Sequence, residues 1–239
     1  VTFVGTVVID AGTTLSIDTE TGDDTNAGAV DFDLAVITAG GASGNLSIDT
    51  STGAANTSGK IRIDGTSAVG GAFPNDITLN ATNPGAGAGP IVMFNSNSLD
   101  GNLDIDGGRF YLGLDAFPAV ITGTGSVTAN GSSTINIDVS TNVLVFDVSS
   151  TIQVADGNLT INANQGGGTP IDQNFNGVLI FGTVQTTGDG NVAITGNGGS
   201  SATDGGYGIE LRSTGKVRST STAAGAGSVT LIGNGGASS

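Results

Sequence analysis

The chain has 239 residues and a formal net charge of -15 at pH 7, because 21 Asp and Glu side chains face only 6 Lys and Arg. This balance argues against a nucleic acid as partner, since phosphate binding needs a basic surface. The absence of His and Cys excludes disulfides, Ser/His/Asp and Cys/His nucleophiles, and the usual zinc and haem ligands.

Glycine content and short alternating segments predict an all-β fold. Gly accounts for 42 residues, well above the usual share of about 7%. Apolar and polar residues alternate in "TLSID", "NLSID", "KIRID" and "NLTIN", which is the period of a β-strand. No stretch has helical spacing, and no apolar run is long enough to span a membrane. We therefore expect many short strands and no membrane-spanning segment.

Strands that resemble one another recur along the whole chain. Their first apolar residues are Leu15, Leu46, Ile77, Leu103, Val127, Leu159, Val192 and Val229. Two or three strands fill each interval, so we predict a right-handed parallel β-helix, or β-solenoid, of about seven to eight irregular coils. The first apolar residues should stack inside it, beside a second inward column formed by Ile17, Ile48, Leu79, Ile105, Ala129, Ile161 and Ile194.

Residues 1–239 read as a single solenoid segment that is an excerpt of a longer repeat protein. The chain opens directly on a strand phrase, "VTFVGTVVID", and its last phrase, "GSVTLIGNGGASS", starts a further coil. Strands near Val7 and Val229 would then expose unpaired backbone, so we expect these ends to fray or to associate with neighbouring repeats or other copies.

The connection from the first to the second strand of a coil varies in length. Its offset is 14 or 15 residues in the first three coils and 17 or 19 in the last two, but only 7 from Leu103 to Phe110 and 8 from Val127 to Ile135. Stacked coils align their corners. We therefore expect the long loops to share one edge of the solenoid, where such proteins make contacts.

A polar ladder should follow the second inward column. Its members are Asp18, Asp49, Asn80, Asp106, Asn130, Asn162, Thr195 and Ile232. Asn and Asp suit a corner because they hydrogen-bond nearby backbone amides, and we favour this structural role. Asp18 above Asp49 would cost about 1 kcal/mol in water and about 3 to 4 kcal/mol at an effective dielectric near 20. We therefore predict at most a weak, stabilising calcium site at Asp18 and Asp49, without a catalytic role and with no other cofactor.

Paired carboxylates are the only hydrolytic machinery that the composition leaves. The pairs are Asp23 with Asp24, Asp31 with Asp33, and Asp104 with Asp106. Two Asp two residues apart share the outer face of a strand, which any solvated strand produces. We therefore expect no enzyme, and keep as the alternative a carbohydrate-active β-helix, either a polysaccharide depolymerase or a tailspike-like binder. An ice-binding or mineral-binding solenoid is a third hypothesis, but the Thr spacing is too irregular for a flat Thr-x-Thr array.

Basic and aromatic side chains suggest contact points in this acidic chain. The basic residues fall largely into two groups, Lys60 with Arg62 and then Arg212, Lys216 and Arg218. Each group could bind an acidic polysaccharide or another acidic molecule, although local charge balance is the favoured interpretation. Phe175 and Tyr207 could stack on a sugar ring, although packing of their loops onto the coil is favoured.

The segment "TTGDGNVAITGNGGSSATDGGYGIELRSTGKVRSTSTAAGAGSVTLIGNGG" resembles the β-strand repeats of giant bacterial surface exoproteins, the group of filamentous-haemagglutinin-like adhesins and autotransporter passengers. The resemblance is strongest from about Gly157 to the end. It implies an extracellular, cell-surface location and a structural or adhesive role, as a rigid surface or as part of a fibre or coat. Host-surface or matrix glycans are the partners expected, and the resemblance carries no catalytic residues to this chain.

Overall fold

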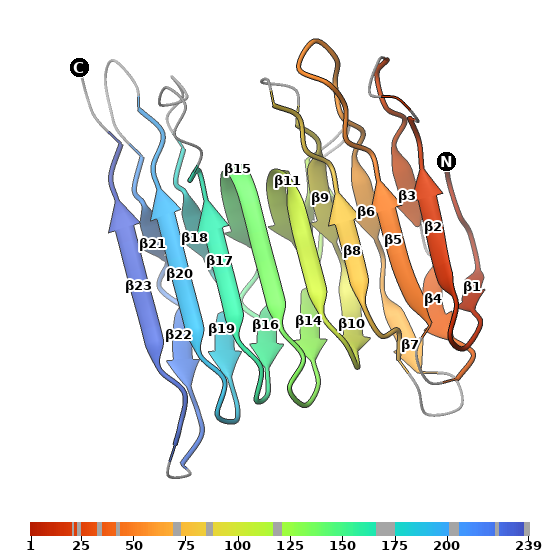
Figure 1. The fold of residues 1–239 in the computed structure, drawn as a ribbon. Helices are drawn as coiled ribbons and strands as arrows, with labels where there is room; N and C mark the ends of the chain where they lie inside the picture. The colour runs from red at the N-terminus through yellow and green to blue at the C-terminus, as the bar shows by residue number, and fades with distance from the viewer. Residues whose placement is uncertain are drawn as a thin grey trace.

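The computed structural model is a parallel β-solenoid of about six turns. It describes all residues except 21, 23–24, 33–34, 42–43, 69–72, 85–87, 117–120, 166–174, 201–205, 223–224 and 237–239. The described residues form strands and no helix. In Figure 1 the chain rises along a front sheet, crosses to the back at the top, descends there and steps toward the C-terminus, which makes the coil right-handed. The predicted fold class is confirmed, with fewer turns than the seven to eight expected.

The front sheet consists of eight strands, and all neighbouring strands in it are parallel. Its strands, in order, are β2 (Thr14–Asp18), β5 (Asn45–Asp49), β8 (Ile77–Asn80), β11 (Leu103–Leu112), β15 (Ile135–Val145), β17 (Leu159–Ala163), β20 (Val192–Asn197) and β23 (Val229–Asn234). β11 and β15 are twice as long as the others because they continue around the upper corner into the second sheet. These two strands join both sheets into one hydrogen-bonded system.

The second sheet lies behind the front sheet (Figure 1). Its order is β3 (Val30–Phe32), β6 (Ile61–Ile63), β9 (Pro90–Met93), the last residues of β11 and β15, β18 (Val178–Ile180) and β21 (Ile209–Leu211). A short antiparallel hairpin, β12 (Leu114–Asp115) with β13 (Ile121–Thr122), leaves the coil after β11. This hairpin is the one described departure from parallel pairing.

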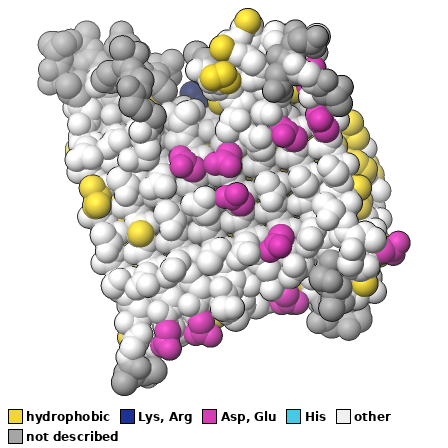
Figure 2. Space-filling model, viewed as in Figure 1, with side chains coloured by type: hydrophobic (Ala, Val, Ile, Leu, Met, Phe, Trp, Pro, Cys, Tyr) yellow, Lys and Arg dark blue, Asp and Glu magenta, His cyan; other side chains and the backbone are white. Residues whose placement is uncertain are grey.

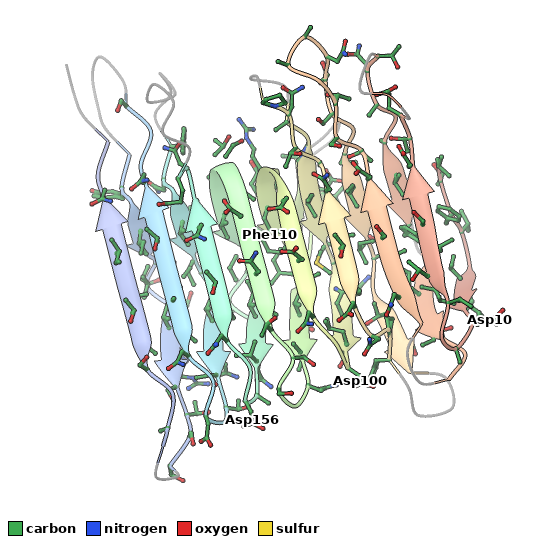
Figure 3. The ribbon with its side chains drawn as sticks, viewed as in Figure 1. Asp10, Asp100, Phe110 and Asp156 are labelled. Atoms are coloured by element: carbon green, nitrogen blue, oxygen red, sulfur yellow. The ribbon has the colours of Figure 1, made fainter. Side chains whose placement is uncertain are left out.

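The third side of the coil consists of two shorter parallel sheets. The first is β1 (Thr6–Ile9), β4 (Val36–Ala39) and β7 (Thr66–Ala68); the second is β10 (Asn95–Leu99), β14 (Gly125–Ala129), β16 (Thr151–Val154), β19 (Thr183–Thr186) and β22 (Lys216–Ser219). Asp10, Asp100 and Asp156 lie along the lower edge, where this side turns into the front sheet (Figure 3). Asp100 accepts a hydrogen bond from the Asn130 side-chain amide at 2.9 Å, which ties two successive turns together.

The core is a stack of inward side chains, as the alternation predicts. In the front sheet Leu46 pairs with Ile77 and Ile48 with Leu79, and all four are at most 1% exposed. Full burial of such a side chain contributes about 1.5 to 3 kcal/mol. Phe110 points into the same core from the second sheet (Figure 3) and is fully buried.

One coil was assigned to the wrong strand. Val127 and Ala129 were expected in the front columns, but they belong to β14 on the third side, where Val127 pairs with Asn97 and Ile152. Ile135 and Ile137 take the front positions, in register with Leu103 and Ile105. The sequence "SVTAN" alternates just as "NLSID" does, and alternation says only that a strand has an inner face. The other inward residues that were predicted are in register.

The repeated phrase near the C-terminus stacks on itself. Residues 192–197 of β20 pair one to one with residues 229–234 of β23. The Gly that precedes each strand allows a close approach: a Cβ at Gly190 would lie 1.8 Å from the Gly157 carbonyl oxygen, and one at Gly227 would lie 1.6 Å from the Gly190 carbonyl oxygen. Real Cβ atoms never come so near. The phrase is therefore repeated because each coil must present the same close surface to the next.

Candidate functional site: the acidic front face and the corner stripe

The front sheet has an acidic outer face without basic side chains. Figure 2 shows the acidic side chains of this face over its N-terminal and central strands, and basic atoms at its upper edge. The last three front strands, β17, β20 and β23, contain no Asp or Glu. None of its strands contributes Lys or Arg at a front position, and Arg109 lies in the part of β11 that belongs to the second sheet. The basic side chains within strands therefore belong to the second and third sides of the coil and not to the front sheet.

The polar ladder is present with one replacement. Asp18 pairs with Asp49, Asp49 with Asn80, and Asp106 with Asp138. Asn130 was expected at the place that Asp138 occupies; it lies instead at the lower corner, because β14 belongs to the third side. The correction follows from the same misassigned strand as Val127.

The first members of the ladder cap the upper corner. Each accepts a hydrogen bond from the backbone N–H two residues later, at 2.9 Å for Asp18, 2.8 Å for Asp49 and 3.1 Å for Asn80. The Asn80 amide also donates to Asp49 at 3.3 Å across the coils. These are the turn-stabilising bonds that short polar side chains favour, and they support the structural role.

The calcium site at Asp18 and Asp49 remains a prediction. The two residues are in register, but the described part of the chain holds no group of three or more His, Cys, Asp or Glu able to surround a metal ion. Calcium prefers six or more oxygens. Any ion between these carboxylates would therefore depend on water and backbone oxygens.

β11 and β15 pass the upper corner differently from the other front strands. They continue from the front sheet into the second sheet without a loop, whereas the other front strands are followed by longer connections (Figure 1). This passage of β11 and β15 is called the direct turn below. The loops do share one edge, as expected, but the second short connection runs from Ile135 to Val143, not from Val127 to Ile135. Asp106 and Asp138 stand in register at this turn.

The two carboxyl groups at the direct turn, Asp106 and Asp138, lose their protons less readily than exposed Asp side chains. Burial, followed by the charges of Asp104 and Asp138, raises the pKa of Asp106 above its usual 3.8. Burial, followed by the charge of Asp104, raises the pKa of Asp138. Asp104 itself accepts a hydrogen bond from the Asn136 amide at 2.9 Å. The charges of Asp104, Asp106 and Asp138 therefore act on one another across two coils.

The other two carboxylate pairs give no site that can be described. Asp23 and Asp24 lie outside the described residues, and so does Asp33. Asp31 faces Arg62, with 3.9 Å between its Oδ1 and the arginine Nε. Its carboxylate therefore takes part in charge balance on the second sheet.

A second polar ladder, at the lower corner, was missed from the sequence. The side-chain oxygen of one coil accepts the backbone N–H of the next: Asn102 from Thr134 at 3.0 Å, Asn158 from Asn191 at 3.0 Å, and Asn191 from Ser228 at 2.9 Å. The signal was the polar residue, usually Asn after Gly, that precedes the first strand of most coils. This ladder links coils on the opposite edge from Asp18.

An aromatic stripe follows the corner between the second sheet and the third side. This corner stripe consists of Phe94, Phe146 and Phe181, which follow β9, β15 and β18. The Phe146 and Phe181 rings lie 5.8 Å apart at 60°. An arginine contacts the aromatic ring at each end of the stripe. The Arg62 guanidinium lies 5.2 Å from the Phe94 ring centre, and the Arg212 guanidinium lies 5.9 Å from the Phe181 ring centre.

The N-terminal half of the corner stripe is covered. Phe94 is 6% exposed and Tyr111 is 7% exposed, and both pack with Val92 in a cluster separate from the core. Leu114 of the β12–β13 hairpin packs on this cluster, and the neighbouring Asp115 forms an ion pair of 2.9 Å with Lys60. The hairpin therefore folds back over β9 and closes the surface.

The two basic groups differ in their partners. Lys60 pairs with Asp115, and Arg62 pairs with Asp64 through two hydrogen bonds of 2.8 and 3.0 Å. Local charge balance thus explains the first group. In the second group Arg212 pairs with Glu210 at 2.9 Å, whereas Lys216 and Arg218 form no ion pair with a described acidic residue.

The two aromatic residues expected in loops also differ. Tyr207 is 65% exposed, so the expectation that it packs its loop onto the coil is wrong. Phe175 is half-buried, and its carbonyl accepts the Gly199 N–H at 2.9 Å. Of these two aromatics, Tyr207 is the one whose ring faces solvent.

Comparison with known proteins yields no relative for this chain: no family model, no curated protein and no solved structure matches it. Among the described residues there is also no helix long and apolar enough to cross a membrane. The function has to be argued from the surfaces described above.

Proposed function

We propose that this chain is a structural or adhesive segment of a secreted bacterial repeat protein, which presents a rigid surface outside the cell or builds a surface fibre or coat. The observation that carries the proposal is the continuous parallel ladder on the front sheet, with polar outer residues on every coil. Side-chain ladders at two corners reinforce it. Such a solenoid is stiff and offers long contact surfaces.

Surface labelling tests this proposal. Antibodies against the purified chain are applied to intact source cells and to permeabilised cells. We expect labelling of intact cells, and reduced surface attachment or a thinner coat when the segment is deleted in frame. Labelling that requires permeabilisation would contradict the extracellular role.

A carbohydrate-active β-helix is the second candidate, and the pairing of two carboxylates at the direct turn is the observation that favours it. Asp106 and Asp138 are in register with raised pKa values, and a glycosidase needs one carboxyl whose pKa is raised. Release of reducing ends from polysaccharides measures such an activity. Release that both Asp106→Asn and Asp138→Asn abolish would favour this candidate over the adhesive one.

A further inference from the structure

The last described coil on the second and third sides holds the most basic surface of the chain. This basic coil is formed by Arg212, Lys216 and Arg218, and all three side chains are exposed. Its described residues include one acid, Glu210, which pairs with Arg212. In a chain with a net charge of -15, three exposed cations in one coil form a local site for an anion.

The three cations point outward along one short path. Val217 packs against the core, so Lys216 and Arg218 project from the outer face of β22, about 7 Å apart along the strand. Arg212 precedes a turn in which the Gly215 N–H donates to the Arg212 carbonyl at 2.8 Å. Four residues span at most about 14 Å, and the turn shortens this distance. The charges therefore form a strip across the corner.

An apolar surface lies directly beside this strip. Phe181 on the preceding coil contacts Arg212, and Phe146 lies one coil further on. Both rings are half-buried, unlike Phe94 in the covered half. The basic coil thus borders aromatic side chains that the described residues cover only in part.

We propose that the basic coil and the open end of the corner stripe bind an anionic saccharide, whose carboxylate or sulfate groups contact Arg212, Lys216 and Arg218 while a sugar ring packs on Phe181. Guanidinium groups bind such anions through paired hydrogen bonds, and an aromatic face packs on the apolar face of a sugar. The inference rests on the proposed adhesive function and names the class of ligand that the surface would hold.

A second copy of this chain fits the same surface less well. The front face of another copy would supply carboxylates, but its outward positions are mainly Ser, Thr, Asn and Asp, which would leave Phe146 and Phe181 without an apolar partner. Stable protein interfaces also cover about 800 Å² on each partner. An open end of two coils suits a short saccharide better.

Calorimetric titration tests the inference with four probes: tetragalacturonate, a heparin tetrasaccharide, the neutral cellotetraose and tetraglutamate. We expect one or both anionic saccharides to bind, and to bind more tightly than the other two probes. Lys216→Gln with Arg218→Gln should weaken this binding at least about tenfold. Phe181→Leu should weaken it about two- to tenfold through loss of stacking.

The matched control has the same net charge as the double Gln variant but leaves the basic coil intact. Ala11→Asp with Ser132→Asp, at two exposed turns, changes the net charge from -15 to -17 as the double Gln variant does. It should bind the saccharide like the parent. Each variant is compared at equal folded fraction by thermal melting.

Four results would overturn the inference: no binding of either anionic saccharide, equal binding of tetraglutamate, affinities that the variants do not change, or dimers that only the double Gln variant dissociates. Each of these would leave surface labelling of intact cells unchanged. Failure of this site is therefore distinguishable from failure of the proposed function.

Discussion

The two halves of the corner stripe occupy equivalent corner positions of the coil, but one half is covered by other residues and the other is partly exposed. Around Phe94 the β12–β13 hairpin covers the apolar surface, and Asp115 and Asp64 neutralise the nearby cations. Around Phe181 no described segment plays this part, and the Arg212 side chain is 51% exposed. A short insertion and the placement of two Asp residues thus distinguish a structural surface from one available for contact.

The largest effect is expected in the covered half. Asp115→Ala leaves the Lys60 ammonium without its buried partner and should destabilise the fold by about 3 kcal/mol. In the open half Glu210→Ala should cost about 0 to 1 kcal/mol, because the Arg212 charge is well solvated. Urea unfolding of the two variants measures both values. Equal losses would refute the distinction between the halves.

The aromatic rings should show a smaller difference of the same sign. Phe94→Ala creates a cavity under the hairpin and should cost about 3 kcal/mol. Phe181→Ala removes a ring that is already partly in water and should cost about 1 kcal/mol. The midpoints of thermal unfolding provide the measurement. A greater loss for Phe181→Ala would mean that its ring is covered.

Asp138 at the direct turn should make the stability of the fold depend on pH, which is not expected of the corner stripe. Because the folded pKa of Asp138 is raised, the folded state binds its proton more tightly than the unfolded state, and stability falls as pH rises from about 3.8 through the folded pKa. Asp138→Asn should therefore stabilise the protein at pH 7 by about 0.5 kcal/mol. The gain should vanish below about pH 3, where the carboxyl is protonated. A variant that is less stable than the parent at pH 7 would contradict this.

The smallest effect concerns the predicted cation site. Calcium at a concentration equal to its dissociation constant would stabilise the fold by about 0.4 kcal/mol, and Asp49→Asn should abolish that gain. Melting temperatures in calcium and in chelator measure it. The same temperature in both, with Asp49→Asn as stable as the parent, would leave the ladder at Asp18 and Asp49 purely structural.

Alternation predicted the core of this fold but not the side to which each strand belongs. Leu46 and Ile48 were placed correctly because a strand with one buried face must alternate. Val127 was misplaced because the hairpin after β11 lengthens that coil, and a 24-residue step then looks like a full turn. The side to which a strand belongs depends on where the chain bends. Gly and Asn occur at nearly every bend of this chain, so they do not distinguish one corner from another.

The candidate sites were predicted unevenly for a similar reason. The ladder through Asp18 and Asp49 repeats in one register, so the sequence reveals it. The corner stripe does not repeat: Phe94, Gly113 and Phe146 occupy equivalent corner positions with different residues. Its coverage depends on a hairpin that folds back onto an earlier coil, and only the tertiary structure shows that contact.

Hydrogen–deuterium exchange with and without the saccharide that binds most tightly tests the central claim most directly. The account predicts slower exchange in residues 209–219 and 178–183 on binding, with residues 90–94 and 109–115 unchanged under their hairpin. Protection over the hairpin or the acidic front sheet, with none in β21 and β22, would contradict it.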